Sequence, residues 1–256
     1  MEIRTEKVTF PSSINGMLAA RIDRPMDDIP GPWAIFANCF TGTKDFLATS
    51  RVTKALAAYG YSVLRFDYTG LGESDGAFEA TTFSSNISDL QAAAAFLSEY
   101  YHAPSLLIGH SLGGAATLFS ASKIPSVKAV VTLNAPCNPQ HVVHHFEQSM
   151  DEINAKGYAE ITVGGRSFRV GKPFVDDLKT QSTTEALADF QAALLVCHTP
   201  ADLVVGVDQA AQIFSHAKHP KSFLSLGKAD HLLTKKEDCL YIAKVIQAWA
   251  APYLAV

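Results

Sequence analysis

The sequence predicts an α/β protein whose open, mostly parallel sheet of about eight strands carries helices on both faces. The first observation is a set of short, almost continuously apolar runs, as in parallel strands buried on both faces. These runs are Trp33–Asn38, Tyr61–Asp67, Ser105–His110, Val127–Leu133, Ala192–His198 and Ser222–Leu226. The second is that longer amphipathic stretches alternate with them and fit helices: Leu47–Tyr59, Asn86–Tyr101, Leu112–Lys123, Asp208–Ala217 and Lys235–Ala251.

Two further strands are expected at the N-terminus. The segments Ile3–Phe10 and Met17–Asp23 flank Asn15-Gly16. An Asn-Gly pair favours the tight turn of an antiparallel hairpin. The hairpin and the six apolar runs together give the expected strand number.

The chain is expected to form a single domain over residues 1–256, with a cap-like insertion at about 137–190. This stretch is far longer than one crossover helix needs, and such a segment can cover a site at the edge of the sheet. The alternative is a structural excursion with no role in binding. Within it the pattern predicts a helix, a hairpin turning at Gly164-Gly165 and a short second helix: His141–Asn154, Ala159–Val163, Ser167–Val170 and Phe174–Thr180.

Composition and charge narrow the class of protein. The 256 residues are 48% hydrophobic with a formal net charge of −4, which excludes a disordered chain. No basic cluster is longer than Lys235-Lys236, so no nucleic-acid partner is expected. The first residues lack an apolar signal segment, and the uncharged window Ala103–Ser122 is broken by Pro104 and glycines, so no membrane span is expected. The four scattered cysteines then indicate reduced thiols and a cytoplasmic location.

The strongest local motif is Gly109-His110-Ser111-Leu112-Gly113, a G-x-S-x-G between an expected strand and an expected helix. A nucleophilic serine must stand on a sharp, strained turn, and glycines two residues before and after it leave room for that turn. The helix that follows supplies unpaired N–H groups where an oxyanion forms. Ser111 is therefore the candidate nucleophile and the surrounding residues its elbow. The alternative is that Ser111 only caps a helix.

A serine hydroxyl needs a base and an oriented acid partner, and both are expected on loops that follow later strands. His231 lies just after Ser222–Leu226, and Asp202 follows Ala192–His198. Asp202 would hold the imidazole tautomer and stabilise the imidazolium. Other residues are less well placed relative to the ends of the strands. For the base they are His110, His216 and His219, and for the acid they are Asp230 and Asp208, which is expected to cap a helix.

Two backbone N–H groups are expected to bind the oxyanion. Leu112 follows the nucleophile, and Phe40 lies in the loop after Trp33–Asn38. The expected chemistry needs no cofactor. We expect no metal site either, because no nearby acid or cysteine completes a clear ligand set with His141, His144 and His145.

From Trp33 to Trp249, this sequence resembles serine esterases of the α/β-hydrolase fold. The resemblance rests on the elbow, on the Asp67-x-x-Gly70-x-Gly72-x-Ser74 turn, on Asp202 and on Ala229-Asp230-His231. More narrowly, the segments 38–45 and 219–223 resemble bacterial hydrolases that occur fused to an OsmC-like peroxidase domain. The present length has no room for that domain, so no peroxidase activity is implied. Many relatives carry His-Gly where this sequence has Asn38-Cys39.

The resemblance implies a carboxylesterase that cleaves small soluble esters through an acyl-enzyme, with no obligatory protein partner. Other acyl hydrolase chemistry or perhydrolase chemistry would use the same three residues. A protein of another class, a non-catalytic α/β-hydrolase that binds a ligand, is the remaining alternative.

Overall fold

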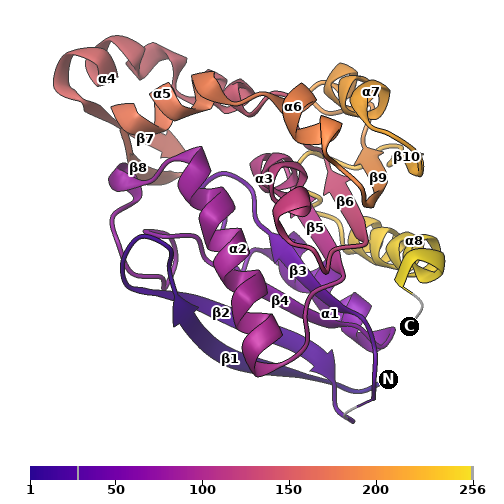
Figure 1. Cartoon of the computed structure of the whole chain (residues 1–256). Helices are drawn as coiled ribbons and strands as arrows, with labels where there is room; N and C mark the ends of the chain where they lie inside the picture. Colours follow the sequence, from indigo (N-terminus) through magenta and orange to yellow (C-terminus); the bar gives the residue numbers. More distant parts are fainter. Residues whose placement is uncertain (28, 255–256) are drawn as a thin grey trace.

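The computed structural model describes residues 1–27 and 29–254, and the predicted fold class is confirmed (Figure 1). Eight strands form one sheet in the order β1-β2-β4-β3-β5-β6-β9-β10, in which only β2 runs against the others. The strands are β1 Ile3–Pro11, β2 Met17–Pro25, β3 Trp33–Ala37, β4 Ser62–Phe66, β5 Leu106–His110, β6 Ala129–Leu133, β9 Ala193–His198 and β10 Lys221–Ser225.

Helices cover both faces of this sheet, as Figure 1 shows. Alternate strand residues point to opposite faces, so the sheet has two apolar cores. Helices α1 (Leu47–Ala58) and α8 (Lys236–Leu254) pack on one face. Helices α2 (Phe83–Tyr100), α3 (Leu112–Ser120) and α7 (Val207–His216) pack on the other.

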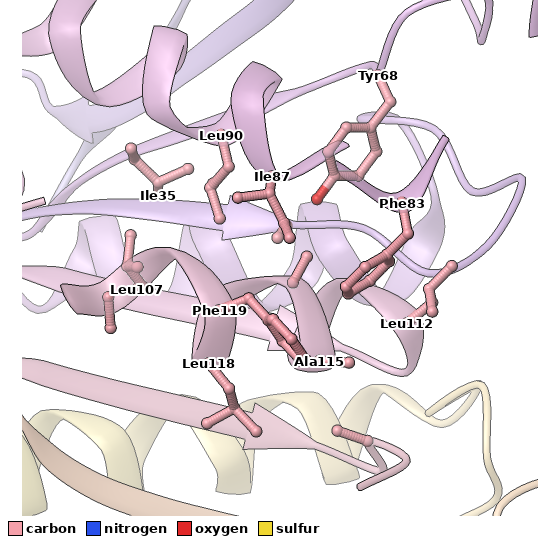
Figure 2. Close-up of a cluster of buried hydrophobic side chains, with 14 of the residues drawn as sticks. Ile35, Tyr68, Phe83, Ile87, Leu90, Leu107, Leu112, Ala115, Leu118 and Phe119 are labelled. Carbon is pink, nitrogen blue, oxygen red and sulfur yellow. The ribbon is translucent and has the colours of Figure 1, made fainter. Parts of the chain in front are cut away.

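The core between α2, α3 and the sheet includes Leu112, the first residue of α3 (Figure 2). Phe83 of α2 meets Phe119 of α3 edge-on, with ring centroids 5.3 Å apart. The sequence places the start of α2 at Asn86, but the helix begins at Phe83. The side chain of Thr82 accepts the N–H of Ser85 and that of Ser85 accepts the N–H of Thr82, a reciprocal cap that fixes this start.

The segment between β6 and β9 forms a separate small layer above α2 and α3 (Figure 1). It contains a two-stranded antiparallel sheet, short helices and 3₁₀ turns. The elements are η3 Pro139–His145, η4 Glu147–Ser149, α4 Met150–Lys156, β7 Tyr158–Val163, β8 Arg166–Gly171, α5 Lys172–Thr180 and α6 Thr183–Ala188.

One prediction within this segment is wrong. The continuous helix over His141–Asn154 is instead two 3₁₀ turns followed by α4. Phe146, whose φ is −141°, interrupts the helical path. The predicted hairpin is present, and α6 was missed.

No helix among residues 1–27 and 29–254 combines the length and apolarity that crossing a membrane requires.

Two further 3₁₀ turns, η1 (Phe78–Ala80) and η2 (Ala121–Lys123), complete the elements.

Candidate active site

Ser111 occupies a strained turn between β5 and α3. Its φ of 53° and ψ of −124° are rare for a residue with a side chain. A Cβ on Gly109 would lie 2.4 Å from the carbonyl oxygen of Gly113, and one on Gly113 would lie 2.2 Å from that of Asn38. Both glycines are therefore required for the close approach of the strand, the helix and the loop after β3.

The structure brings Ser111, His231 and Asp202 together from three loops at the carboxyl end of the sheet. The Nε2 atom of His231 lies 3.2 Å from the Oγ atom of Ser111. The Nδ1 atom of the same ring lies 2.7 Å from Oδ2 of Asp202. All three residues are buried, each with 8% of its surface exposed. Such an arrangement can pass a proton from the hydroxyl to the imidazole.

The Asp202 carboxylate is held in its ionised form. Its Oδ1 atom accepts the N–H groups of Val204 and Val205, both at 2.8 Å. Burial by itself would raise the pKa of Asp202, but the hydrogen bonds from His231 and these N–H groups outweigh it, so the pKa is lowered. Because an ionised carboxylate only accepts, His231 donates from Nδ1 and leaves Nε2 free to accept the serine proton.

The competing acids lie elsewhere. The Asp230 carboxylate accepts the N–H of Thr234, at 3.1 Å, and also the Thr234 hydroxyl. Asp208 was expected to cap a helix, but it lies within the first turn of α7, and Gly206 occupies the capping position. His216 ends α7, and His219 precedes β10.

The loop after β3 places Phe40 beside Leu112. Among the described residues, neither backbone N–H has a hydrogen-bond acceptor within the protein. Asn38 anchors the loop, since its Nδ2 donates to the carbonyl of Phe66 at 2.9 Å and its Oδ1 accepts the Thr49 hydroxyl at 2.7 Å. A cavity of about 10 Å³ lies next to Phe40 and Leu112. The two free donors could bind an oxyanion, and the cavity beside them has room for about one water molecule.

A buried ion pair fixes the far end of this loop. Lys44 is 3% exposed, and its Nζ lies 2.7 Å from Oδ2 of the fully buried Asp67. Burial opposes the charge of Lys44, but hydrogen bonds to Asp67 and Glu73 outweigh it and raise its pKa. The Arg65 guanidinium also donates to the carbonyl of Lys44. Losing one partner would leave a buried charge uncompensated, so the cluster stabilises the loop.

The inserted segment also contacts the loop. Arg166 donates to the carbonyl of Thr41 at 2.6 Å. The Phe40 ring packs against Phe146 and Phe174, with centroids 6.1 and 5.7 Å away. The ring of His145 stacks on Phe40 with the centroids 6.2 Å apart, and partial desolvation there, together with the nearby His231, lowers the pKa of His145. No local sequence pattern predicts these contacts.

The thiol of Cys39 is not activated. Burial raises its pKa to about 11, so it stays protonated near neutral pH. All four cysteines are free. Within residues 1–27 and 29–254, no group of three or more His, Cys, Asp or Glu side chains is arranged to hold a metal ion.

His110 is fully buried behind His231. Its Nε2 lies 2.7 Å from the carbonyl oxygen of His231, and the two rings are 5.3 Å apart. Burial, and then the nearby His231, lower the pKa of His110 from 6.5 to about 4. His110 is therefore neutral at neutral pH. Since a carbonyl only accepts, its Nε2 carries the proton.

This shift predicts a loss of stability in weak acid. The unfolded chain protonates His110 below pH 6.5, whereas the folded protein does so only near pH 4, so stability falls as the pH drops between these values. Between pH 7 and pH 5, wild type should lose about 2 kcal/mol more than His110→Gln. Denaturant unfolding at both pH values measures this, and equal losses in the two proteins would refute it.

Comparisons with known proteins agree with this architecture. The family model described as serine aminopeptidase, S33, matches residues 43–171, half of the chain. The crystal structure of the esterase domain of a Rhodothermus marinus protein is 44% identical, with 99% of each chain covered and a TM-score of 0.80. Est1E from Butyrivibrio proteoclasticus, with ferulic acid bound, is 18% identical over 96% of this chain and 99% of that one, with a TM-score of 0.78, and shares the fold.

A curated relative is more distant. The mitochondrial palmitoyl-protein thioesterase ABHD10 of Mus musculus is 23% identical over 217 residues, which cover 81% of this chain and 71% of that protein. The match to the family model and the full-length likeness to an esterase domain agree on one assignment. The chain belongs to the serine aminopeptidase S33 family of α/β-hydrolase-fold serine hydrolases.

Proposed function

We propose that this protein is a serine hydrolase that cleaves small, soluble carboxylic esters through an acyl-enzyme. One observation carries the proposal: a single imidazole, that of His231, lies 3.2 Å from the Ser111 hydroxyl and 2.7 Å from the Asp202 carboxylate. The strained conformation of Ser111 supports it, because such strain is usually retained at functional sites.

The steps follow from these positions. Ser111 Oγ attacks the ester carbonyl as its proton moves to His231 Nε2, and the N–H groups of Phe40 and Leu112 bind the oxyanion. The C–O bond then breaks, and His231 returns the proton to the departing alcohol. Water, deprotonated by His231, attacks the acyl-enzyme and releases the acid and free Ser111. Asp202 stabilises the imidazolium in both halves of the reaction.

The size of the acyl group is inferred from the surroundings of Phe40. The small cavity beside Phe40 and Leu112 favours a short acyl chain. The 44% identical esterase domain favours an ester over an amide. A thioester is the second candidate, because the curated relative is named a palmitoyl-protein thioesterase.

The proposal also covers the inserted segment, the cellular location, the cofactor requirement and the relation to the fused hydrolases. The segment 137–190 acts as a cap, because Arg166 and the Phe146 and Phe174 rings contact the loop that carries Phe40. The chain works in the cytoplasm without a cofactor, and it corresponds to the hydrolase part of the OsmC-fused proteins that its sequence resembles.

A panel of p-nitrophenyl esters from acetate to dodecanoate, with one acetyl thioester, tests the proposal. We expect kcat/KM to be highest for the shortest acyl chains and to fall with chain length. A fluorophosphonate should abolish turnover: Ser111 Oγ displaces fluoride from phosphorus, and the peptide that contains Ser111 gains the mass of the reagent less HF. The proposal is wrong if no ester is hydrolysed or if the adduct forms on another residue. A profile that rises toward dodecanoate would remove the small-ester assignment.

A further inference from the structure

The carboxyl end of β6 contacts the loops of all three proposed catalytic residues. The carbonyl of Leu133 accepts the N–H of Ser111 at 2.9 Å. The next residue, Asn134, accepts the N–H of Thr199 on Oδ1 at 3.0 Å, three residues before Asp202. Its Nδ2 donates to the carbonyl of His231, also at 3.0 Å. One side-chain amide thus ties the acid loop to the base loop.

Asn134 adopts a backbone conformation that side chains usually avoid. It is fully buried, and its φ of 48° lies in the left-handed region. Asparagine tolerates this region better than most residues, although glycine tolerates it best. The backbone N–H of Asn134 donates to the carbonyl of Cys197 at 2.9 Å, which holds the residue in place. A buried residue in such a conformation indicates that its side chain has a role glycine cannot supply.

The carbonyl of His231 has a second donor. Nε2 of the neutral His110 lies 2.7 Å from it. Two buried side chains, His110 at the end of β5 and Asn134 directly after β6, therefore hold the main-chain carbonyl of His231. The ring of His231 must meet Ser111 and Asp202 at the same time, so its position depends on where this main chain is held.

We propose that Asn134, supported by His110, is a positioning residue that sets the His231 ring between Asp202 and Ser111. The inference rests on the proposed function, because it assigns His231 the role of base. Asn134 touches neither the hydroxyl nor the carboxylate. It acts through the main chain of His231, and a displacement of about 1 Å there can cost about 10²-fold in rate.

Asn134→Gly removes the amide and keeps the left-handed backbone. We expect kcat for p-nitrophenyl acetate to fall by about 10- to 100-fold, while KM changes by less than about threefold, because ester binding does not use the amide. Asn15→Gly, in the turn between β1 and β2, is the matched control and should keep the wild-type kcat. A folded Asn134→Gly with wild-type kcat overturns the proposal.

The His110 pair tests the same contact without touching Asn134. His110→Leu removes the donor and should lower kcat at least fivefold. His110→Gln places an amide nitrogen near the former Nε2 and should restore most of the rate. Equal kcat values for His110→Leu and His110→Gln would mean that His110 only fills space. The supporting role of His110 in positioning His231 would then be wrong. If Asn134→Gly does not fold, this pair still tests whether holding the His231 carbonyl affects kcat, and the NMR signal described next is then compared between His110→Leu and His110→Gln.

A readout independent of turnover separates this inference from the proposed function. The Nδ1 proton of His231, held by Asp202, should give a resolved low-field ¹H NMR signal in wild type. Asn134→Gly should broaden or shift it, and Asn15→Gly should not. If no ester is hydrolysed but the signal responds in this way, the positioning contact stands and the esterase proposal fails. An unchanged signal in Asn134→Gly overturns the positioning role.

Discussion

Ser111→Ala is expected to lower kcat for p-nitrophenyl acetate by about 10⁴-fold or more, with the fold intact. The variant loses the only atom that can form the acyl-enzyme at this turn. It retains the N–H groups of Phe40 and Leu112, so a small residual rate above that of water should remain. The Ser111 hydroxyl has His231 as its side-chain partner, and alanine fits the same space. Steady-state kinetics and thermal unfolding of the same preparation measure both quantities.

Ser120→Ala is the matched control. Ser120 ends α3, the helix that begins at Leu112, and it is fully buried with its hydroxyl bonded to the carbonyl of Ala116. Its replacement also removes a buried hydroxyl, and kcat should change by less than about twofold. A Ser111→Ala protein that keeps a tenth or more of the wild-type kcat would mean that another group attacks the ester.

The fold could be predicted because its signals are local. Each central strand is a short apolar run that ends within two residues of the predicted bounds, as for Leu106–His110. The glycines of the elbow could be found in the same way, because backbone strain at Ser111 demands small neighbours at fixed spacing. Strand order also limits the candidates, since the loops at the carboxyl ends of neighbouring parallel strands meet at one edge.

The rest depends on contacts between distant segments. Arg166 reaches Thr41 across 125 residues, and nothing in either local sequence indicates the contact. Phe146, which separates the two 3₁₀ turns of residues 139–149, packs against Phe40, and a helical pattern does not encode that contact. Asn134 gave one usable signal, a polar residue directly after a buried strand. Its importance becomes visible only when Thr199 and His231 lie beside it.

Asp202→Asn is expected to preserve the fold and to lower kcat by about 10⁴-fold. The Asn side chain can keep an oxygen toward the N–H groups of Val204 and Val205, so the loop stays closed. Its NH₂ group then faces Nδ1 of His231 and requires that nitrogen to accept. The imidazole carries its proton on Nε2 instead, toward Ser111, and can no longer take the serine proton. The loss therefore comes from the wrong tautomer rather than from a displaced ring.

Asp208→Asn makes the same chemical change six residues later, in the first turn of α7, and should leave kcat within about twofold of wild type. KM should be similar in all three proteins, because neither carboxylate contacts the ester. A near-normal kcat for Asp202→Asn would place the acid elsewhere, with Asp230 as the next residue to test. A large loss in both variants would point to a general effect on the loop after β9. Only a loss confined to Asp202 ties the rate to the carboxylate that lies 2.7 Å from the His231 ring.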